Sequence, residues 1–353
     1  MFDSANGDFD IQKNHINGLG NYVITSGLTD NGILGKTDIS AKIFDKNTIT
    51  IDMFGNTFFR SFQYKIVTHA RVFSVKSKVG ISEKQGLFLA NSFHFLSKKF
   101  GYDNMCSWVK IKSEYIQLPT KNKKIDFDFM ETFITELEKE RISKLDVYLE
   151  ASGLKDYNLT VEEQKVLDDF ENINWGTHKI NKLFNKLNLK NHNKSFEKIL
   201  DTSTTKTPEF NLPLVNAKLG NNGIMFYGRE KDFDSSEMTI DVISNGAVAT
   251  GTVYAQPYKT GVLWDAYLLK PTVENISKKN LLYMATSLQK SIKTKFGWED
   301  KAVWSKVQHE NMSLPINNKE PDYKTMETLI SAIQKQVIKD VVLYTDKKLN
   351  VAK

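Results

Sequence analysis

The sequence has a single cysteine, and it lacks long apolar runs and a signal peptide. Cys106 is its single cysteine, which excludes an internal disulfide and a cysteine-based metal cluster, and fits a reducing compartment. No apolar run approaches the roughly 18 residues that a membrane span needs, and no signal peptide opens the chain. These absences predict a cytoplasmic protein with no membrane partner.

Common catalytic motifs are also absent. The chain has no phosphate-binding Gly-x-x-x-x-Gly-Lys-Ser/Thr loop, no Gly-x-Ser-x-Gly elbow and no Asn/Asp-Pro-Pro-aromatic motif. His69, His94 and His178 stand singly, so we do not interpret them as metal ligands or bases. Asp52 and Asp241 each follow Thr-Ile and are interpreted as turn-capping residues. We therefore expect no catalytic site, no metal and no cofactor in this chain.

The sequence does contain a long internal repeat. Residues 99–148 match residues 295–344 without a gap, with 18 identities in 50 positions. For example, Lys99-Phe100-Gly101-Tyr102 returns as Lys295-Phe296-Gly297-Trp298. A repeat of this length far exceeds the roughly 20–50 residues of solenoid units. The chain is therefore two copies of one domain-plus-helix unit.

Upstream of this repeat the two copies match more loosely. Asn31-Gly32-Ile33 corresponds to Asn222-Gly223-Ile224, and Thr50-Ile51-Asp52 to Thr239-Ile240-Asp241. Met1-Phe2 aligns with Leu183-Phe184, so residues 175–180 have no counterpart in the first copy. Two domains that recognise different sequences would need a shared framework with differing loops. Random drift in surface loops would give the same pattern.

Alternating hydrophobicity predicts strands at 48–53 and 71–75, and a helix at 86–99. A longer helix is predicted at 126–151, and a short capped helix at 160–170. The long helix and its copy place apolar residues near coiled-coil a/d spacing. These inter-helix packing residues are Met130, Ile134, Leu137, Leu145 and Tyr148, with Met326, Ile330, Ile333, Val337 and Tyr344 in the copy.

Positive charge lies mainly in the two globular pieces. Net charge is +4 in residues 1–119, −6 in 120–175, +6 in 176–315 and +2 in 316–353. Basic domains beside an acidic spacer suit a polyanion held at two places. A general abundance of lysine is the alternative explanation.

Several segments resemble the specificity subunits of restriction–modification systems, of the type I and Bcg-like type IIB groups. The segments are 7–13, 47–56, 68–73 and Leu118-Pro119 followed by 125–131. The most specific is the Leu-Pro, a short polar stretch, and then Asp-Phe-x-x-Met-Glu opening a helix. The resemblance covers essentially the whole chain, although the first domain is short at its N-terminal edge.

The resemblance implies a mixed α/β (α+β) fold with two homologous target-recognition domains and an internal pseudo-twofold. Two long conserved helices separate the domains and are expected to pack as an antiparallel coiled coil. We expect target-recognition domains at 1–119 and 175–315, a helical spacer and linker at 120–174, and a second spacer at 316–353.

The resemblance further implies double-stranded DNA as a partner, with each domain reading half of a bipartite site. Catalysis is expected in partner methyltransferase, or fused methyltransferase–nuclease, subunits that use S-adenosylmethionine. The helices, including Glu131, Glu136, Glu138 and Glu140, are candidates for docking these partners.

Candidate DNA contacts are polar residues of the loops, because Arg or Lys pairs with guanine and Asn or Gln with adenine. They are Ser26, Thr29, Asn31, Lys36, Asn56, Arg60, Lys65, His69 and Arg71 in the first domain, and Asn216, Lys218, Asn221, Asn222, Arg229, Asn245, Tyr258 and Lys259 in the second. The alternative is that each serves only a turn or the solvated surface. Two other functions stay open: a non-catalytic adaptor whose twin domains bind protein, and an enzyme with an unfamiliar site.

Overall fold

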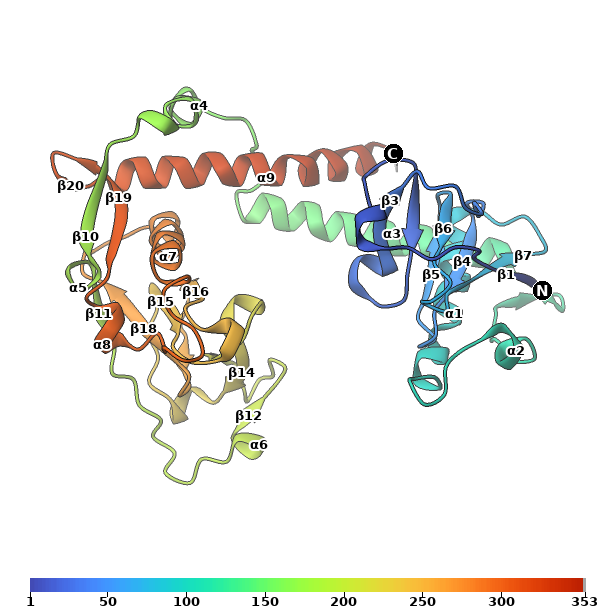
Figure 1. Cartoon of the computed structure of the whole chain (residues 1–353), viewed down its shortest axis with the longest axis horizontal. Coiled ribbons are helices and arrows are strands. Elements are labelled where there is room, and N and C mark those ends of the chain that lie inside the picture. The colour runs from blue at the N-terminus through green and yellow to red at the C-terminus, as the bar shows by residue number, and fades with distance from the viewer. Residues whose placement is uncertain (352–353) are drawn as a thin grey trace. The chain divides into compact units, whose positions relative to one another are not determined.

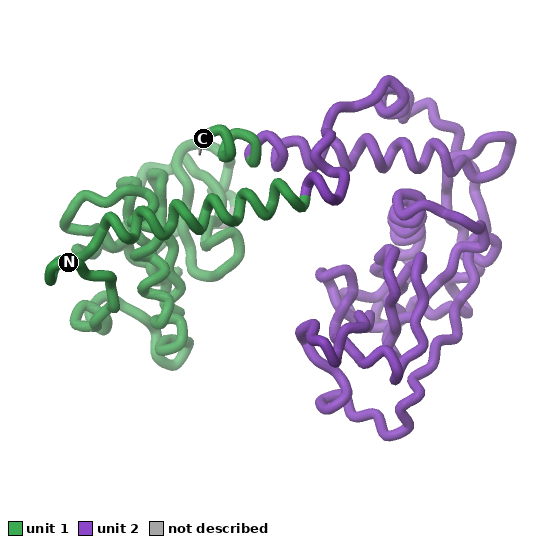
Figure 2. Tube along the Cα trace, turned by 180° about the vertical axis from the view of Figure 1, so that it is seen from behind, with its two compact units in different colours: residues 1–148, 345–353 green, residues 149–344 purple. Residues whose placement is uncertain are grey.

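The structure, a computed structural model, describes residues 1–351, which divide into two units. Unit 1 comprises residues 1–148 and 345–353, and unit 2 comprises residues 149–344 (Figure 2). Each unit is a mixed α/β domain joined to a long helix (Figure 1). The last residues of each long helix are grouped with the other unit.

The strands of unit 1 are β1 (Phe2–Asn6), β2 (Asn21–Ile24), β3 (Ile33–Thr37), β4 (Thr48–Ile51), β5 (Thr57–Arg60), β6 (Tyr64–Ile66), β7 (Phe73–Ser77), β8 (Thr120–Lys121) and β9 (Lys124–Ile125). Its helices are α1 (Glu83–Ser92), α2 (Trp108–Ile111) and α3 (Phe127–Ala151), with 3-10 turns η1 (Lys13–His15), η2 (Thr29–Gly32) and η3 (His94–Lys98).

The strands of unit 2 are β10 (Trp175–Lys179), β11 (Phe184–Lys186), β12 (Thr202–Ser203), β13 (Leu212–Val215), β14 (Ile224–Gly228), β15 (Thr239–Ile243), β16 (Val253–Gln256), β17 (Gly261–Val262), β18 (Ala266–Pro271), β19 (Asn311–Asn317) and β20 (Glu320–Pro321). Its helices are α4 (Val161–Asp168), α5 (Ile180–Leu183), α6 (Lys198–Asp201), α7 (Lys278–Ile292), α8 (Trp304–Val307) and α9 (Tyr323–Val351), with η4 (Phe170–Asn172), η5 (Asn221–Gly223), η6 (Glu230–Asp232) and η7 (Ala247–Ala249).

The helix and strand predictions are largely confirmed. The strand at 48–53 is β4, the strand at 71–75 is β7, and the helix at 126–151 is α3. The helix expected at 86–99 begins earlier and is divided into α1 and η3. It begins after Ser82 because the Ser82 hydroxyl accepts a hydrogen bond from the Gln85 amide while the Gln85 side chain accepts one from the Ser82 amide.

The duplication is visible in the sheet topology. Strand order is β1-β7-β4-β5 in unit 1 and β11-β18-β15-β16 in unit 2. A second sheet has the order β3-β2-β6 in unit 1, and unit 2 repeats it as β14-β13-β17 with β12 added at the edge. In both second sheets the last pair is parallel, and the register shifts at the same place, between Val23 and Ile24 or between Leu214 and Val215. The two units therefore share one frame.

The pairing register corrects one part of the predicted alignment. Phe2 lies opposite Ser77 and Phe184 opposite Pro271. Three residues before Ser77 and Pro271 lie Ser74 and Leu268, which are therefore equivalent. Ser74 pairs with Thr50 and Leu268 pairs with Asp241, so Thr50 is the equivalent of Asp241. Asp52 and Asp241 are therefore not equivalent, and the turn-capping prediction is wrong for Asp241. It lies inside β15, fully buried, and neither carboxyl oxygen has a hydrogen-bond partner within residues 1–351.

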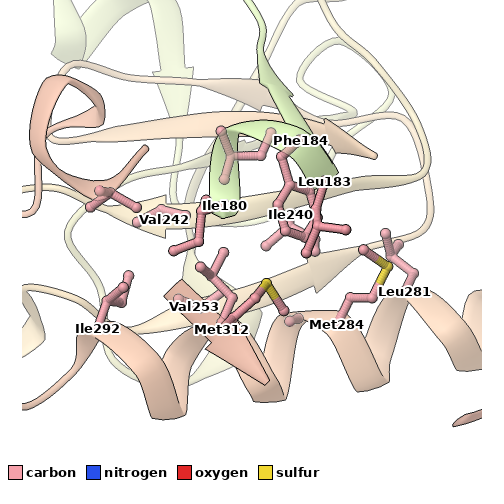
Figure 3. Packing of buried hydrophobic residues seen from close by; sticks show 14 of the residues in the cluster. Ile180, Leu183, Phe184, Ile240, Val242, Val253, Leu281, Met284, Ile292 and Met312 are labelled. Atoms are coloured by element: carbon pink, nitrogen blue, oxygen red, sulfur yellow. The ribbon is translucent and has the colours of Figure 1, made fainter. Parts of the chain in front are cut away.

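Each sheet packs on its own helices. In unit 2, α7 covers the β11-β18-β15-β16 sheet, and Ile180, Ile240, Leu281 and Met284 are fully buried between them (Figure 3). Unit 1 repeats this core with Ile49, Leu89 and other apolar residues. Burial of such side chains stabilises each unit by about 1.5–3 kcal/mol per residue.

The first turn of each long helix belongs to this core, which corrects part of the coiled-coil prediction. Met130 and Met326 are fully buried within their own domains and do not belong to an inter-helix seam. Tyr148, Val337 and Tyr344 are 61%, 73% and 52% exposed. Each helix first packs on its own domain, so the heptad pattern in its first turn reports contacts with the domain core.

The other predicted packing residues are partly shielded. Ile330 is 9% exposed, Ile134 and Leu145 are half-buried, and Leu137 and Ile333 are 37% and 41% exposed. Leu149, which broadens the predicted apolar stripe, and Val342, which the pattern did not select, are each 1% exposed.

Candidate nucleic-acid interface

In unit 1, several loops lie at one end of the two sheets, where β2, β4 and β6 end and β7 begins. The loop at 25–32 is closed by a hydrogen bond of 2.9 Å from the Thr25 amide to the Gly32 carbonyl. The Asp52 carboxylate accepts hydrogen bonds of 2.9 Å from the amides of Gly27, Phe54 and Asn56. Asp52 thus joins this loop to the turn at 52–56, which confirms its turn-capping role.

Unit 2 repeats this arrangement with different side chains. The loop at 216–223 is closed by a hydrogen bond of 3.2 Å from the Asn216 amide to the Gly223 carbonyl. Asn31 and Asn222 both have left-handed backbone, with φ of 54° and 52°. Asparagine tolerates this conformation better than most residues do, which explains why Asn-Gly recurs here.

A buried side chain from the neighbouring strand holds each of these turns. The Arg60 guanidinium donates to the Asn31 carbonyl at 2.7 Å and to the Thr50 hydroxyl at 2.9 Å. At the equivalent position, the Gln256 amide donates to the Asn222 carbonyl at 2.7 Å. Arg60 is 2% exposed, and burial lowers its pKa to about 10. Arg60 therefore supports the loop and is not placed to contact bases, which corrects that prediction.

Three more predicted contacts are engaged within the fold. Lys65 is 3% exposed and donates to the carbonyls of Thr37 and Ile39. Asn216 is 5% exposed and accepts a hydrogen bond of 2.9 Å from the Asp265 amide. Arg229 forms ion pairs with Asp201 at 2.8 Å, Glu209 at 2.7 Å and Asp232 at 3.4 Å. These hydrogen bonds to carboxylates raise the pKa of Arg229 and compensate its charge.

The structure brings together some of the remaining candidates and separates others. In unit 1, Ser26, Thr29, Asn31, Asn56, His69 and Arg71 lie in the loops at the shared end of the sheets. In unit 2, Lys218, Asn221, Asn222 and Asn245 lie in the equivalent loops. Lys36 lies away from the first group, near the other end of β3, where its ammonium is 4.6 Å from the centre of the Tyr22 ring.

Tyr258 and Lys259 follow β16, whose last residue, Gln256, holds the Asn222 turn. Gln256 pairs with Thr239 at the start of β15, whereas Asn245 follows the end of β15. Lys259 pairs with Glu230 at 2.9 Å, and Lys278 lies 4.3 Å from the centre of the Tyr258 ring.

Sequence reasoning missed the aromatic residues of this surface. Tyr102 and Trp298 are 75% and 71% exposed at the fourth position of the repeated Lys-Phe-Gly-aromatic motif. Tyr102 packs edge-on against Phe54 of the turn at 52–56, with ring centres 5.0 Å apart. Trp264, between β17 and β18, is 61% exposed. The signal was present as an aromatic residue kept in both copies, but it was interpreted only as a mark of duplication.

The arrangement offers hydrogen-bonding groups and flat rings. Hydrogen-bonding groups suit base edges in the DNA grooves, and apolar rings suit thymine methyl groups. Cys106 is 2% exposed, and burial raises the pKa of its thiol to about 12, so it is not a reactive nucleophile. Across residues 1–351, no three His, Cys, Asp or Glu side chains gather as a metal site would require. Among the helices in that range, none combines the length and hydrophobicity of a membrane-spanning segment.

Comparisons with known proteins agree with this arrangement. Residues 1–147 match the family model of the type I restriction modification DNA specificity domain. Over 343 residues, the chain is 22% identical to the type II restriction enzyme BgcI specificity subunit S.BcgI of Heyndrickxia coagulans, covering 96% of this chain and 93% of that protein. The type I restriction–modification S subunit from M. genitalium has the same fold, with a TM-score of 0.55 and 15% identity over 99% of this chain and 90% of that one.

Proposed function

We infer that this chain, which belongs with the specificity subunits of restriction–modification systems, recognises double-stranded DNA for a complex whose catalysis lies in partner subunits. The observation that carries this inference is the repeated loop frame. Both units place an Asn-Gly turn, a buried supporting side chain and an exposed aromatic residue at equivalent positions. The loops around them differ in sequence, so we propose that the two domains read different half-sites.

We propose that bases are contacted by the exposed and half-buried residues of these loops. In unit 1 these are Thr29, Asn31, Asn56, His69 and Arg71, with Tyr102 added. In unit 2 they are Lys218, Asn221, Asn222 and Asn245, with Trp264 and Trp298 added. Asparagine can donate to and accept from adenine, and each well-formed pair gives about 1–3 kcal/mol of discrimination.

The long helices are proposed to set the spacer between the half-sites. α3 has 25 residues and α9 has 29. At about 1.5 Å per residue these helices span roughly 38 and 44 Å, compared with roughly 34–36 Å for one turn of DNA. Antiparallel packing of the two helices would relate the domains by a pseudo-twofold and place them about one DNA turn apart.

The partners are proposed to be methyltransferase, or fused methyltransferase–nuclease, subunits that bind S-adenosylmethionine, and the complex is proposed to act in the cytoplasm. Of the acidic residues considered for docking, Glu131 accepts from Ser82, Glu138 lies 3.9 Å from Lys84, and Glu140 pairs with Lys144. Because Glu136 is exposed, it is the one of these four that we favour for a partner contact.

Methylation mapping in a host that carries this chain and its methyltransferase tests the function. Wild type should give one bipartite motif. Asn31→Ala with Asn56→Ala should relax only one half, and Asn222→Ala with Asn245→Ala only the other. Lys36→Ala, at the other end of β3 from the interface loops, is the control and should leave the motif unchanged. Relaxation of both halves by either pair, or of neither, would contradict the assignment.

The adaptor alternative is tested by titrating the purified chain with labelled duplex. Specific binding should weaken steeply as salt rises, because phosphate contacts release counterions. A protein-binding adaptor would show no salt-dependent affinity for DNA.

A further inference from the structure

One face of unit 2 is covered by a segment that has no counterpart among the described residues of unit 1. β10 pairs antiparallel with β19, from Trp175 opposite Pro315 to Lys179 opposite Asn311 (Figure 1). Beyond the ends of this ladder, the Ile316 amide donates to the Asn174 carbonyl at 2.9 Å, and the Ile180 amide donates to the Glu310 carbonyl at 3.0 Å. β10 thus completes an edge that β19 would otherwise expose.

The covering segment also places two aromatic rings on the adjacent helices. Phe170 and Trp175 lie edge-on to each other, with ring centres 6.1 Å apart. Together with Tyr283 of α7 and Leu329 of α9, they line a largely apolar cavity of about 530 Å³. Under this cover Leu329 is 4% exposed.

Among residues 1–351, no strand pairs with residues 115–118, the equivalent backbone edge of unit 1. Residues 115–121 correspond to β19, yet only Thr120–Lys121 form a strand, and that strand pairs with β9. Along an antiparallel edge, the backbone N–H and C=O groups of every second residue point toward the neighbouring strand. The backbone groups of Glu310 and Ile316 point toward β10, so those of Met312 and Leu314 do too. Their equivalents in unit 1 are Ile116 and Leu118. Within residues 1–351, the amides of these two residues make no backbone hydrogen bond.

Three aromatic rings lie on the helices of the same face. Phe88 of α1 is 5.6 Å from Phe133 and 6.3 Å from Phe129 of α3, measured between ring centres. Phe129 and Phe133 are each 48% exposed, and Phe133 is the equivalent of the buried Leu329. Phe88 and Ile116 contact the same core cluster, so the rings and the open edge belong to one surface. Gathered exposed apolar side chains of this kind mark interaction sites.

We propose that this surface, formed by residues 115–118 with Phe88, Phe129 and Phe133, binds an extended segment of a partner polypeptide. The segment adds a strand to the 115–118 edge and places an aromatic side chain on the three rings. The second unit supplies the argument for this occupant, because there an aromatic-bearing strand covers the same face of the same frame. Strand addition of this type combines backbone hydrogen bonds with side-chain pockets. The proposal does not depend on which DNA sequence is read.

A peptide with the sequence of residues 166–181 serves as the probe, labelled with fluorescein and titrated with the full chain. We expect saturable binding with one peptide per chain. Phe133→Glu should weaken it by roughly tenfold or more, because a charge replaces buried apolar contact. Tyr102→Glu, which adds the same charge at an exposed aromatic residue outside this surface, should leave binding unchanged.

Backbone methylation of the peptide tests strand pairing without altering the protein. A methyl group on the amide nitrogen of His178 removes a donor that faces the edge, and should weaken binding by roughly tenfold. The same methyl on the neighbouring Thr177 nitrogen faces away and should have little effect.

Three results would overturn the proposal. The first is no saturation up to about 1 mM peptide, a concentration that would detect even weak binding. The second is equal binding of the two methylated peptides. The third is a wild-type dimer in sedimentation that Phe133→Glu converts to monomer, which would assign this surface to a second copy of the chain.

Discussion

The buried carboxyl of Asp241 should make unit 2 less stable as pH rises. Burial raises the pKa of Asp241 well above its usual value of 3.8, and neither of its oxygens has a hydrogen-bond partner. The nearby Tyr267 hydroxyl is also buried and unpaired, and the Asp241 charge contributes to raising its pKa. Nothing close by therefore compensates an ionised carboxylate at this position.

The sign follows from proton linkage. The unfolded chain releases the Asp241 proton near its ordinary pKa, whereas the folded chain retains it to higher pH. Stability from this residue is therefore complete below about pH 4 and falls by about 1.4 kcal/mol per pH unit until the raised pKa is reached. Asp241→Asn keeps the shape and removes the titration. At neutral pH the variant should therefore be more stable than wild type, by about 1.4 kcal/mol for every pH unit over which only the folded chain retains the Asp241 proton.

Urea unfolding at several pH values between about 4 and 8 measures this difference. Four of the five tryptophans, Trp175, Trp264, Trp298 and Trp304, lie in unit 2, so fluorescence reports mainly on that unit. Asp52→Asn is the matched control. Because Asp52 accepts hydrogen bonds from three amides, its loss should destabilise unit 1 by about 1–3 kcal/mol. An Asp241→Asn variant with the pH slope of wild type would refute the reasoning.

Three further predictions follow from particular contacts. Trp298→Ala should weaken duplex binding by about 1–3 kcal/mol, because apolar contact with base edges in the groove is lost, whereas Lys36→Ala should change the affinity less than about twofold, as measured by fluorescence anisotropy. Arg60→Leu should leave the Asn31 carbonyl without its donor, lower stability by about 1–3 kcal/mol in urea unfolding and relax one half-site in methylation mapping. Burial would raise the pKa of Glu163, but hydrogen bonds from Thr160, Ser331 and Lys335 lower it to about 2. Stability from Glu163 should therefore be complete above about pH 4.5 and fall as pH approaches 2, and Lys335→Ala should reduce this dependence in acid titrations followed by circular dichroism.

Sequence patterns predicted the frame better than the site. The 196-residue repeat and the Asn-Gly turns identified equivalent positions that the sheets reproduce. Residue type did not reveal burial, because Arg60 and Lys65 have the chemistry of DNA contacts but donate to carbonyls inside the fold. Pairing register was also hidden, since the repeated Thr-Ile-Asp triplets are offset by two residues in the sheets. Likewise, the heptad pattern of α3 and α9 did not distinguish residues that pack on the domain core, such as Met130 and Met326, from residues along the rest of the helix.

The central claim is that two unlike domains read a bipartite site whose gap is set by helix length. The most direct measurement inserts one heptad after Lys144 in α3 and another after Asp340, its equivalent in α9, and maps methylation. Seven helical residues add roughly 10.5 Å, or about 3 base pairs. We predict a spacer lengthened by about this amount with both half-sites unchanged. An active complex that keeps the wild-type spacer would contradict the account.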